Sequence, residues 1–161
     1  MIRLAGEIGG GMVFANGARS HMTASLSALP ESKRKSPTFF IGNMVPTCIT
    51  DDIAAARAVH RRTLTHYATL PNYRNYWKEA GYAEEMDAIE KAIGEGRRDD
   101  IPKYLTDRWL DDCTLSGPPA KIRDGIEAWR AAGVSTPIVV PSSAAGNQLK
   151  AIEETLAAFK D

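Results

Sequence analysis

The chain has 161 residues, a length typical of one domain that can bury a core. Its 43% hydrophobic and 25% charged residues exclude a mainly disordered or fibrous protein. Because 20 Lys and Arg balance 20 Asp and Glu, no net charge attracts the chain to nucleic acid or to an anionic membrane.

The first third of the chain predicts a helix, a strand and a second helix. Apolar residues recur at helical spacing in 1–11, until consecutive glycines end the pattern. The short apolar run 12–15 is typical of a parallel strand that is buried on both faces. A second helical pattern begins at Ser20 and ends at Pro30, and the polar, basic segment 31–36 is expected to be a loop.

The middle of the chain predicts a longer strand followed mainly by helices. Aromatic and aliphatic residues in 38–45 suit a strand in a covered sheet. Asp51 or Asp52 caps the next helix, which Pro71 ends. The segment 72–112 has no strand pattern, so we expect a helical excursion of about forty residues.

The last third predicts a helix, a strand and a final helix. Ser116 or Gly117 caps the first of these helices, and Gly133 ends it. The β-branched run 137–141 predicts a short strand, and Asn147 caps the helix that follows. Four apolar residues align on one face of this final helix: Leu149, Ile152, Leu156 and Phe159.

This order of elements indicates an α/β fold with a parallel sheet. Only about three strands are visible, whereas a closed (β/α)8 barrel needs eight βα units in about 250 residues. Open sheet edges are normally covered or paired. We therefore expect either a partner chain or a missing amino-terminal half.

Common cofactor and metal motifs are absent. Phe14 stands where a dinucleotide-binding GxGxxG pattern needs its last glycine, and no strand precedes the glycine cluster. There is no Walker A motif and no nucleophile elbow, and the three histidines lack metal-binding spacing, so no metal is predicted. Lys33–Lys35 reads more simply as a solvated segment than as a nucleic-acid contact.

Two places carry a candidate anion site. The turn Asn16–Ser20 lies between a predicted strand and a helix, where exposed N–H groups, the helix dipole and Arg19 attract an anion. An ordinary βα turn with an incidental arginine fits these residues equally well. Arg108, beside Trp109, either binds a phosphate through its guanidinium or forms an ion pair with one of its acidic neighbours at 107, 111 and 112.

Three segments together resemble a known family. Leu4–Phe14 resembles a recurrent segment of the bacterial luciferase-like superfamily of flavin- or deazaflavin-dependent TIM-barrel oxidoreductases. Asp107–Leu110, followed by Gly117 and the next helix, is similar to the penultimate segment of that family, and Gly133–Ser142 to its closing strand. The resemblance covers essentially the whole chain.

The resemblance implies that residues 1–161 are one domain, the carboxyl-terminal half of a barrel, with strands six to eight and a helical excursion before the last strand. It implies FMN or an F420-type deazaflavin as cofactor, and a small-molecule substrate near 43–47 and 141–145. It assigns the binding of the cofactor phosphate to these residues: Asn16, Gly17, Ala18, Arg19 and Arg108, with Lys78 or Arg74 assisting.

The same resemblance leaves the activity of this chain open. Relatives usually have Asp at the position of Gly10, and the turn after the first strand has no lysine, so the choice between FMN and a deazaflavin stays open. The first strands of the family's barrel carry most catalytic side chains, and this chain lacks them. The alternative is therefore a non-catalytic remnant, or a half-barrel that needs a homodimer or a partner chain.

The expected compartment is the cytoplasm. Cys48 and Cys113 are isolated thiols without the spacing of a disulfide framework. No apolar run approaches the roughly 18 residues of a membrane span, and the amino terminus does not have the pattern of a signal peptide.

Overall fold

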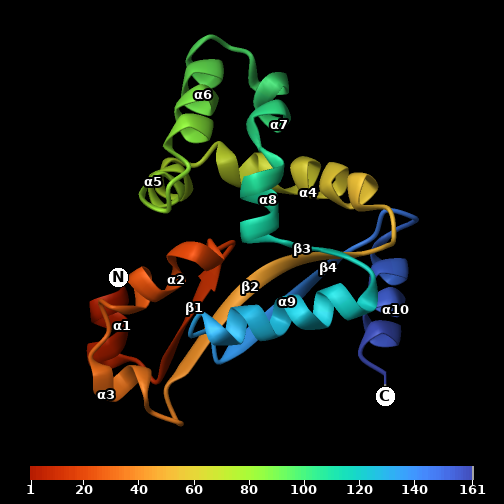
Figure 1. The fold of residues 1–161 in the computed structure, drawn as a ribbon. Coiled ribbons are helices and arrows are strands. Elements are labelled where there is room, and N and C mark those ends of the chain that lie inside the picture. Colours follow the sequence, from red (N-terminus) through yellow and green to blue (C-terminus); the bar gives the residue numbers. More distant parts are fainter. Residues whose placement is uncertain (161) are drawn as a thin grey trace.

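The computed structural model describes residues 1–160 and shows helices alternating with parallel strands (Figure 1). The strands are β1 (Gly11–Ala15), β2 (Phe40–Ile49), β3 (Leu115–Gly117) and β4 (Thr136–Ser142). The helices are α1 (Ile2–Ile8), α2 (Arg19–Leu26), α3 (Glu31–Arg34), α4 (Ile53–Ala68), α5 (Pro71–Glu79), α6 (Ala83–Gly94), η1 (Arg98–Asp100), α7 (Ile101–Tyr104), α8 (Asp107–Cys113), α9 (Pro119–Ala131) and α10 (Gln148–Ala158).

Strand β2 is the centre of one parallel sheet. Its residues 42–48 pair with β4, while 40–44 pair with β1 and 47–49 with β3. Because β4 takes one edge of β2, β1 and β3 share the other edge. The α/β prediction with a parallel sheet is confirmed, with β3 as a fourth, unpredicted strand.

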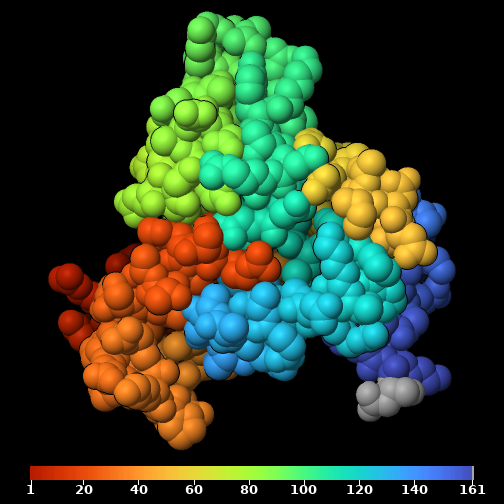
Figure 2. Space-filling model, viewed as in Figure 1, coloured from red at the N-terminus to blue at the C-terminus, as the bar shows by residue number. Residues whose placement is uncertain are grey.

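One face of the sheet, here called the outer face, is covered by α2 and α9, which lie side by side in Figure 2. Along β2, the alternate residues Ile41 and Val45 are buried on this face, as expected when neighbouring side chains point to opposite sides. They pack in one core cluster with apolar side chains of the two helices: Met22, Leu26, Ile122, Ile126 and Trp129.

The opposite, inner face of the sheet is open. Val13 is 52% exposed, and Phe40 and Met44 are each 41% exposed. The prediction that the first strand is buried on both faces is therefore wrong, because no helix of residues 1–160 covers this side of β1. Within the described residues, the outward edges of β1 and β4 also pair with no strand.

Helices α5 to α8 form a lobe beside the carboxyl ends of the strands, as Figure 1 shows. This lobe has a core of its own, in which the rings of Trp77 and Trp109 meet edge to face with centroids 4.7 Å apart. Ala18, from the turn after β1, is buried in the same cluster. The predicted helical excursion is confirmed, and its core fixes the lobe against that turn.

Several boundaries follow from tertiary contacts. Asp52 caps α4, where its carboxylate accepts a hydrogen bond from the Ala55 N–H at 2.9 Å, and Asn147 caps α10. The helix predicted from Ser116 or Gly117 begins only at Pro119, because 115–117 pair with β2. The segment expected as a loop at 31–36 contains the short helix α3.

The aligned apolar face of α10 is exposed to solvent rather than packed. Leu149 is 70% exposed and Leu156 68%, whereas Ala151 and Ala158 are buried. Helix α10 therefore contacts the rest of the molecule through small residues and leaves its large apolar side chains free. No helix in residues 1–160 combines the length and the apolar character needed to cross a membrane.

Candidate functional site

A hollow of about 320 Å³ lies at the ends of β1 and β4, beside the middle of β2, and we call it the strand-end hollow. Parallel α/β folds bind ligands at this end of the sheet. The residues that line it come from the three strands, α4, α5 and the start of α10, and include Met44, Pro46, Tyr67, Tyr73, Pro141 and Ser142. Two stretches were predicted near the substrate, 43–47 and 141–145. Both contribute to this hollow, the first through Met44 and Pro46 and the second through Pro141 and Ser142.

Asn16 directly follows the last residue of β1 and also lines the strand-end hollow. It is 5% exposed and adopts φ 56°, a left-handed conformation that asparagine tolerates better than most residues. Its carbonyl oxygen accepts a hydrogen bond from Trp77 Nε1 at 3.1 Å. Its side-chain Nδ2 has no partner in residues 1–160, so a buried donor stands next to the hollow.

The backbone N–H groups of the turn after β1 are largely occupied. The Gly17 N–H donates to Asn43 Oδ1 at 3.1 Å, and the Ala18 N–H donates to the Tyr76 hydroxyl at 3.0 Å. The expectation of exposed N–H groups is wrong at these two residues, because side chains from distant segments already accept their hydrogen bonds. An anion at this turn needs a side-chain donor instead.

Asp112, which the sequence suggested only as an ion-pair partner of Arg108, instead accepts hydrogen bonds from the amino end of α2. Its carboxylate accepts hydrogen bonds from the Ser20 N–H at 2.9 Å, from Ser20 Oγ at 2.7 Å and from the Tyr82 hydroxyl at 2.8 Å. It therefore lies at the amino end of α2, where the helix dipole favours a negative charge. Burial and the hydrogen bond to Asp112 raise the pKa of Tyr82, so this phenol stays protonated.

Arg108 projects from α8 toward the start of α6. Its guanidinium donates to the Gly81 carbonyl at 2.9 Å and to Glu85 Oε1 at 3.3 Å, and it stacks over the Tyr82 ring at 4.3 Å. It lines a separate hollow that contains acidic side chains rather than the one that holds Arg19. The structure does not bring these two predicted cofactor ligands together.

Lys78 and Arg74 lie inside the helical lobe and form ion pairs there. Lys78 Nζ is 2.7 Å from both Asp87 and Glu90, and these carboxylates raise the pKa of its ammonium. Arg74 is buried, and its Nε lies 3.2 Å from Glu90 Oε1. Because Arg108, Lys78 and Arg74 already pair with carboxylates, their role in binding a cofactor stays a prediction.

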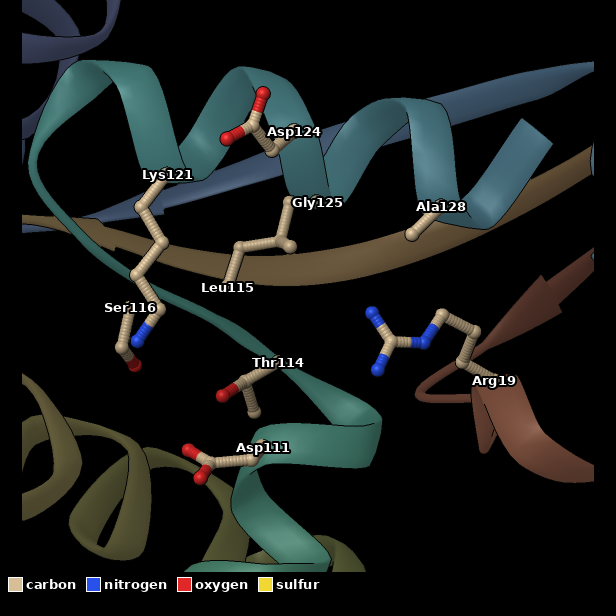
Figure 3. A pocket seen from close by; sticks show the side chains of 9 residues that line it. All are labelled: Arg19, Asp111, Thr114, Leu115, Ser116, Lys121, Asp124, Gly125 and Ala128. Atoms are coloured by element: carbon tan, nitrogen blue, oxygen red, sulfur yellow. The ribbon is translucent and has the colours of Figure 1, made fainter. Parts of the chain in front are cut away.

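A second hollow, of about 360 Å³, lies between α2, α8, β3 and α9, and we call it the helix-side hollow (Figure 3). Figure 3 shows the Arg19 guanidinium directed into it. Within residues 1–160, no carboxylate lies at salt-bridge distance from Arg19, while Asp111 on the same hollow is paired with Arg57 at 2.7 Å. Arg19 is thus the predicted cation that stays available to an anion.

His60, on α4, is fully buried below β3. Its Nε2 lies 3.3 Å from the Leu115 carbonyl oxygen, and burial lowers the pKa of the imidazole to about 4. The ring is therefore neutral near pH 7 and supports β3, and it lines neither hollow. Among residues 1–160, no three His, Cys, Asp or Glu side chains gather as metal ligands do.

Comparison with known proteins gives a consistent result. Residues 1–136 match the model of the family described as "Luciferase-like monooxygenase". A Mycobacterium tuberculosis protein named "Putative coenzyme F420-dependent oxidoreductase" is 30% identical over 123 residues, which are 73% of this chain and 35% of that protein.

Two solved structures share the fold. The coenzyme F420-dependent tetrahydromethanopterin reductase of Methanopyrus kandleri superposes with a TM-score of 0.71 at 19% identity, over 99% of this chain and 48% of that one. An F420-dependent secondary alcohol dehydrogenase, in complex with an F420–acetone adduct, gives 0.65 at 12% identity, over 99% and 46%. The chain thus spans about a third of the first relative and about half of each solved structure.

Proposed function

Because the chain belongs to the luciferase-like monooxygenase family, we propose that it forms the cofactor-phosphate-binding part of a deazaflavin-dependent oxidoreductase. The names of three relatives, which all refer to F420, support a deazaflavin rather than FMN. The observation that carries the proposal is the unpaired Arg19 guanidinium, which points into a hollow beside the turn after β1.

The residues present fit an anionic group at Arg19 better than at the turn amides. A guanidinium matches a phosphate with paired N–H donors and keeps its charge at any physiological pH. The Gly17 and Ala18 N–H groups already have acceptors, so in our proposal Asn16, Gly17 and Ala18 shape the turn that holds Arg19 in place. Asp112 supports the same turn through Ser20.

The strand-end hollow fits the planar, less polar part of such a cofactor or its substrate. Its walls combine Met44, Leu64 and Val140 with the rings of Tyr67 and Tyr73, a lining that excludes water from a flat ligand. A bound deazaflavin supplies hydride transfer, and the protein supplies position and electrostatics. In this proposal the unpartnered Asn16 Nδ2 offers a hydrogen bond at the edge of the hollow.

Fluorescence titration of coenzyme F420 onto the purified chain tests this proposal. We expect saturable binding, and we expect Arg19→Gln to weaken it about tenfold to a hundredfold, because a charged hydrogen bond contributes about 1.5–3 kcal/mol. Arg34→Gln is the matched control, since Arg34 is exposed on α3 and has no ion pair in residues 1–160. No binding, or equal affinities for the two variants, contradicts the proposal.

The exposed inner face supports a second candidate function, a half-barrel that acts only with another chain. Val13, Phe40 and Met44 are exposed on this face, and both sheet edges are free in residues 1–160. Open edges and apolar sheet faces associate readily. Sedimentation velocity is expected to show concentration-dependent association of the chain, and a monomer at all concentrations argues against this candidate.

A further inference from the structure

The helix-side hollow contains a second cation that the proposed function does not use. Lys121, on the first turn of α9, extends across β3 so that its ammonium lies beside Ser116, at the opposite end of the hollow from Arg19 (Figure 3). Within residues 1–160, Lys121 has no carboxylate at salt-bridge distance. The hollow therefore has a free positive charge at each end.

Gly117 allows this position of the lysine. It adopts φ +141°, and a Cβ atom added there would come 2.8 Å from Lys121 Cδ. The aliphatic stem of Lys121 thus lies directly against the glycine, in space that any other residue would fill. Lys121 as a whole is exposed, while its stem packs on this glycine and its ammonium lies over the hollow.

Ser116 provides an independent sign that a ligand belongs here. The residue is 7% exposed, lines the hollow, and its Oγ has no hydrogen-bond partner in residues 1–160. A buried hydroxyl without a partner costs free energy unless something donates to it or accepts from it. A negatively charged oxygen placed between this hydroxyl and the Lys121 ammonium would satisfy both groups.

The acidic residues of the hollow do not cancel these charges. The Asp111 carboxylate is held by Arg57, with Nη2 at 2.7 Å and Nε at 3.3 Å. Figure 3 shows the Asp124 carboxylate turned away from Ser116 and from the Lys121 ammonium. The positive groups at the two ends thus face the interior of the hollow with little opposition.

We propose that Lys121 and Ser116 form a second anion subsite, opposite Arg19 in the helix-side hollow, for a ligand that carries two separated negative groups. The inference rests on the proposed function only in that the same ligand reaches Arg19. Its chemical class is a phosphorylated compound with a further phosphate or carboxylate, since two cations at the ends of one hollow match two anionic groups.

Titration calorimetry with orthophosphate, pyrophosphate and tripolyphosphate tests the proposal without a cofactor. If one ligand contacts both cations, we expect the affinity to rise along this series, because a longer anion brings its terminal groups closer to both ends of the hollow. Lys121→Gln should abolish this rise and weaken tripolyphosphate about tenfold, while orthophosphate changes by less than about twofold. Ser116→Ala should weaken tripolyphosphate by a smaller factor.

Lys91→Gln is the matched control, because Lys91 is exposed on α6, away from both hollows. Urea unfolding of each variant checks that the fold is kept. If Lys121→Gln and Lys91→Gln bind tripolyphosphate equally well, the subsite is wrong, even where coenzyme F420 still binds through Arg19. If the affinity depends on Lys121 but coenzyme F420 does not bind, the subsite stands and the proposed cofactor is wrong.

Discussion

The two faces of the sheet differ in how completely this chain covers them. On the outer face, Met22 and Trp129 are buried below α2 and α9, with 0% and 1% exposure. On the inner face, Phe40 and Met44 of the central strand remain 41% exposed. One chain thus builds a complete core on one side and presents an apolar surface on the other.

This difference separates the residues that keep the fold from the residues that meet a ligand. The strand-end hollow lies beside the open face, where Met44 and Pro46 contribute to its wall. The helix-side hollow depends instead on how α8 and α9 pack, because its walls come from helices and from β3. The open face is therefore where we expect a ligand or another chain to bind.

The sharpest test of this comparison replaces one methionine on each face with alanine. Met22→Ala removes a fully buried side chain of the outer core and should lower the free energy of unfolding by about 2–5 kcal/mol. Met44→Ala removes a half-exposed side chain of the inner face and should lower it by about 1 kcal/mol. Urea denaturation with intrinsic tryptophan fluorescence measures both.

Equal losses for the two variants would show that the inner face is packed in solution, by a second copy or by a rearranged helix. The measurement is made at several protein concentrations. If the inner face associates, the loss of stability in Met44→Ala should depend on concentration, whereas the loss in Met22→Ala should not.

The covered part of the molecule contains a buried histidine, so we expect the free energy of unfolding to depend on pH. His60 has a pKa of about 4 when folded, against about 6.5 when unfolded, so the unfolded chain binds an extra proton between these values. The contribution of His60 to the free energy of unfolding is therefore fully present above about pH 6.5 and is lost as the pH decreases toward 4. The expected loss between pH 7 and pH 5 is about 2 kcal/mol.

The control for this prediction is His60→Gln, which keeps a side-chain donor for the Leu115 carbonyl but does not titrate. Urea unfolding at pH 7 and at pH 5 should show a smaller loss in this variant than in the parent chain. If both lose the same stability, carboxylate pairs such as Arg57 with Asp111 determine the acid sensitivity, and His60 does not.

The sequence predicted the elements that depend on local patterns. Helical periodicity located α4, α9 and α10, and the capping residues Asp52 and Asn147 act as expected. Strand β3 was missed because its three residues have no strand pattern of their own and extend only because they pair with 47–49 of β2. A contact between distant segments decides such an element, and periodicity does not show it.

The candidate site shows the same limit. The local sequence located the turn after β1, but it indicated free N–H groups where the structure has hydrogen bonds, and the role of Arg19 stays a prediction. The acceptors Asn43, Tyr76 and Asp112 follow the turn by 26, 58 and 92 residues, so no local pattern reveals them. Likewise, periodicity aligned the apolar face of α10 but did not show that this face is left exposed.

The smallest expected effect on stability concerns Phe40, because a change at this residue should affect association of the chain more than its folding. Phe40→Thr introduces a β-branched residue, which suits a strand, and removes a large aromatic group from the open face, so the free energy of unfolding should change by about 0.5 kcal/mol or less. Association in sedimentation velocity should nevertheless weaken clearly, since apolar area at a contact contributes about 25 cal/mol per Å².

Ala131→Thr, on the exposed surface of α9, is the matched control. Association that survives Phe40→Thr would place the contact elsewhere, with Leu149 and Leu156 of α10 as the surface to change next, because both are largely exposed on one face of that helix.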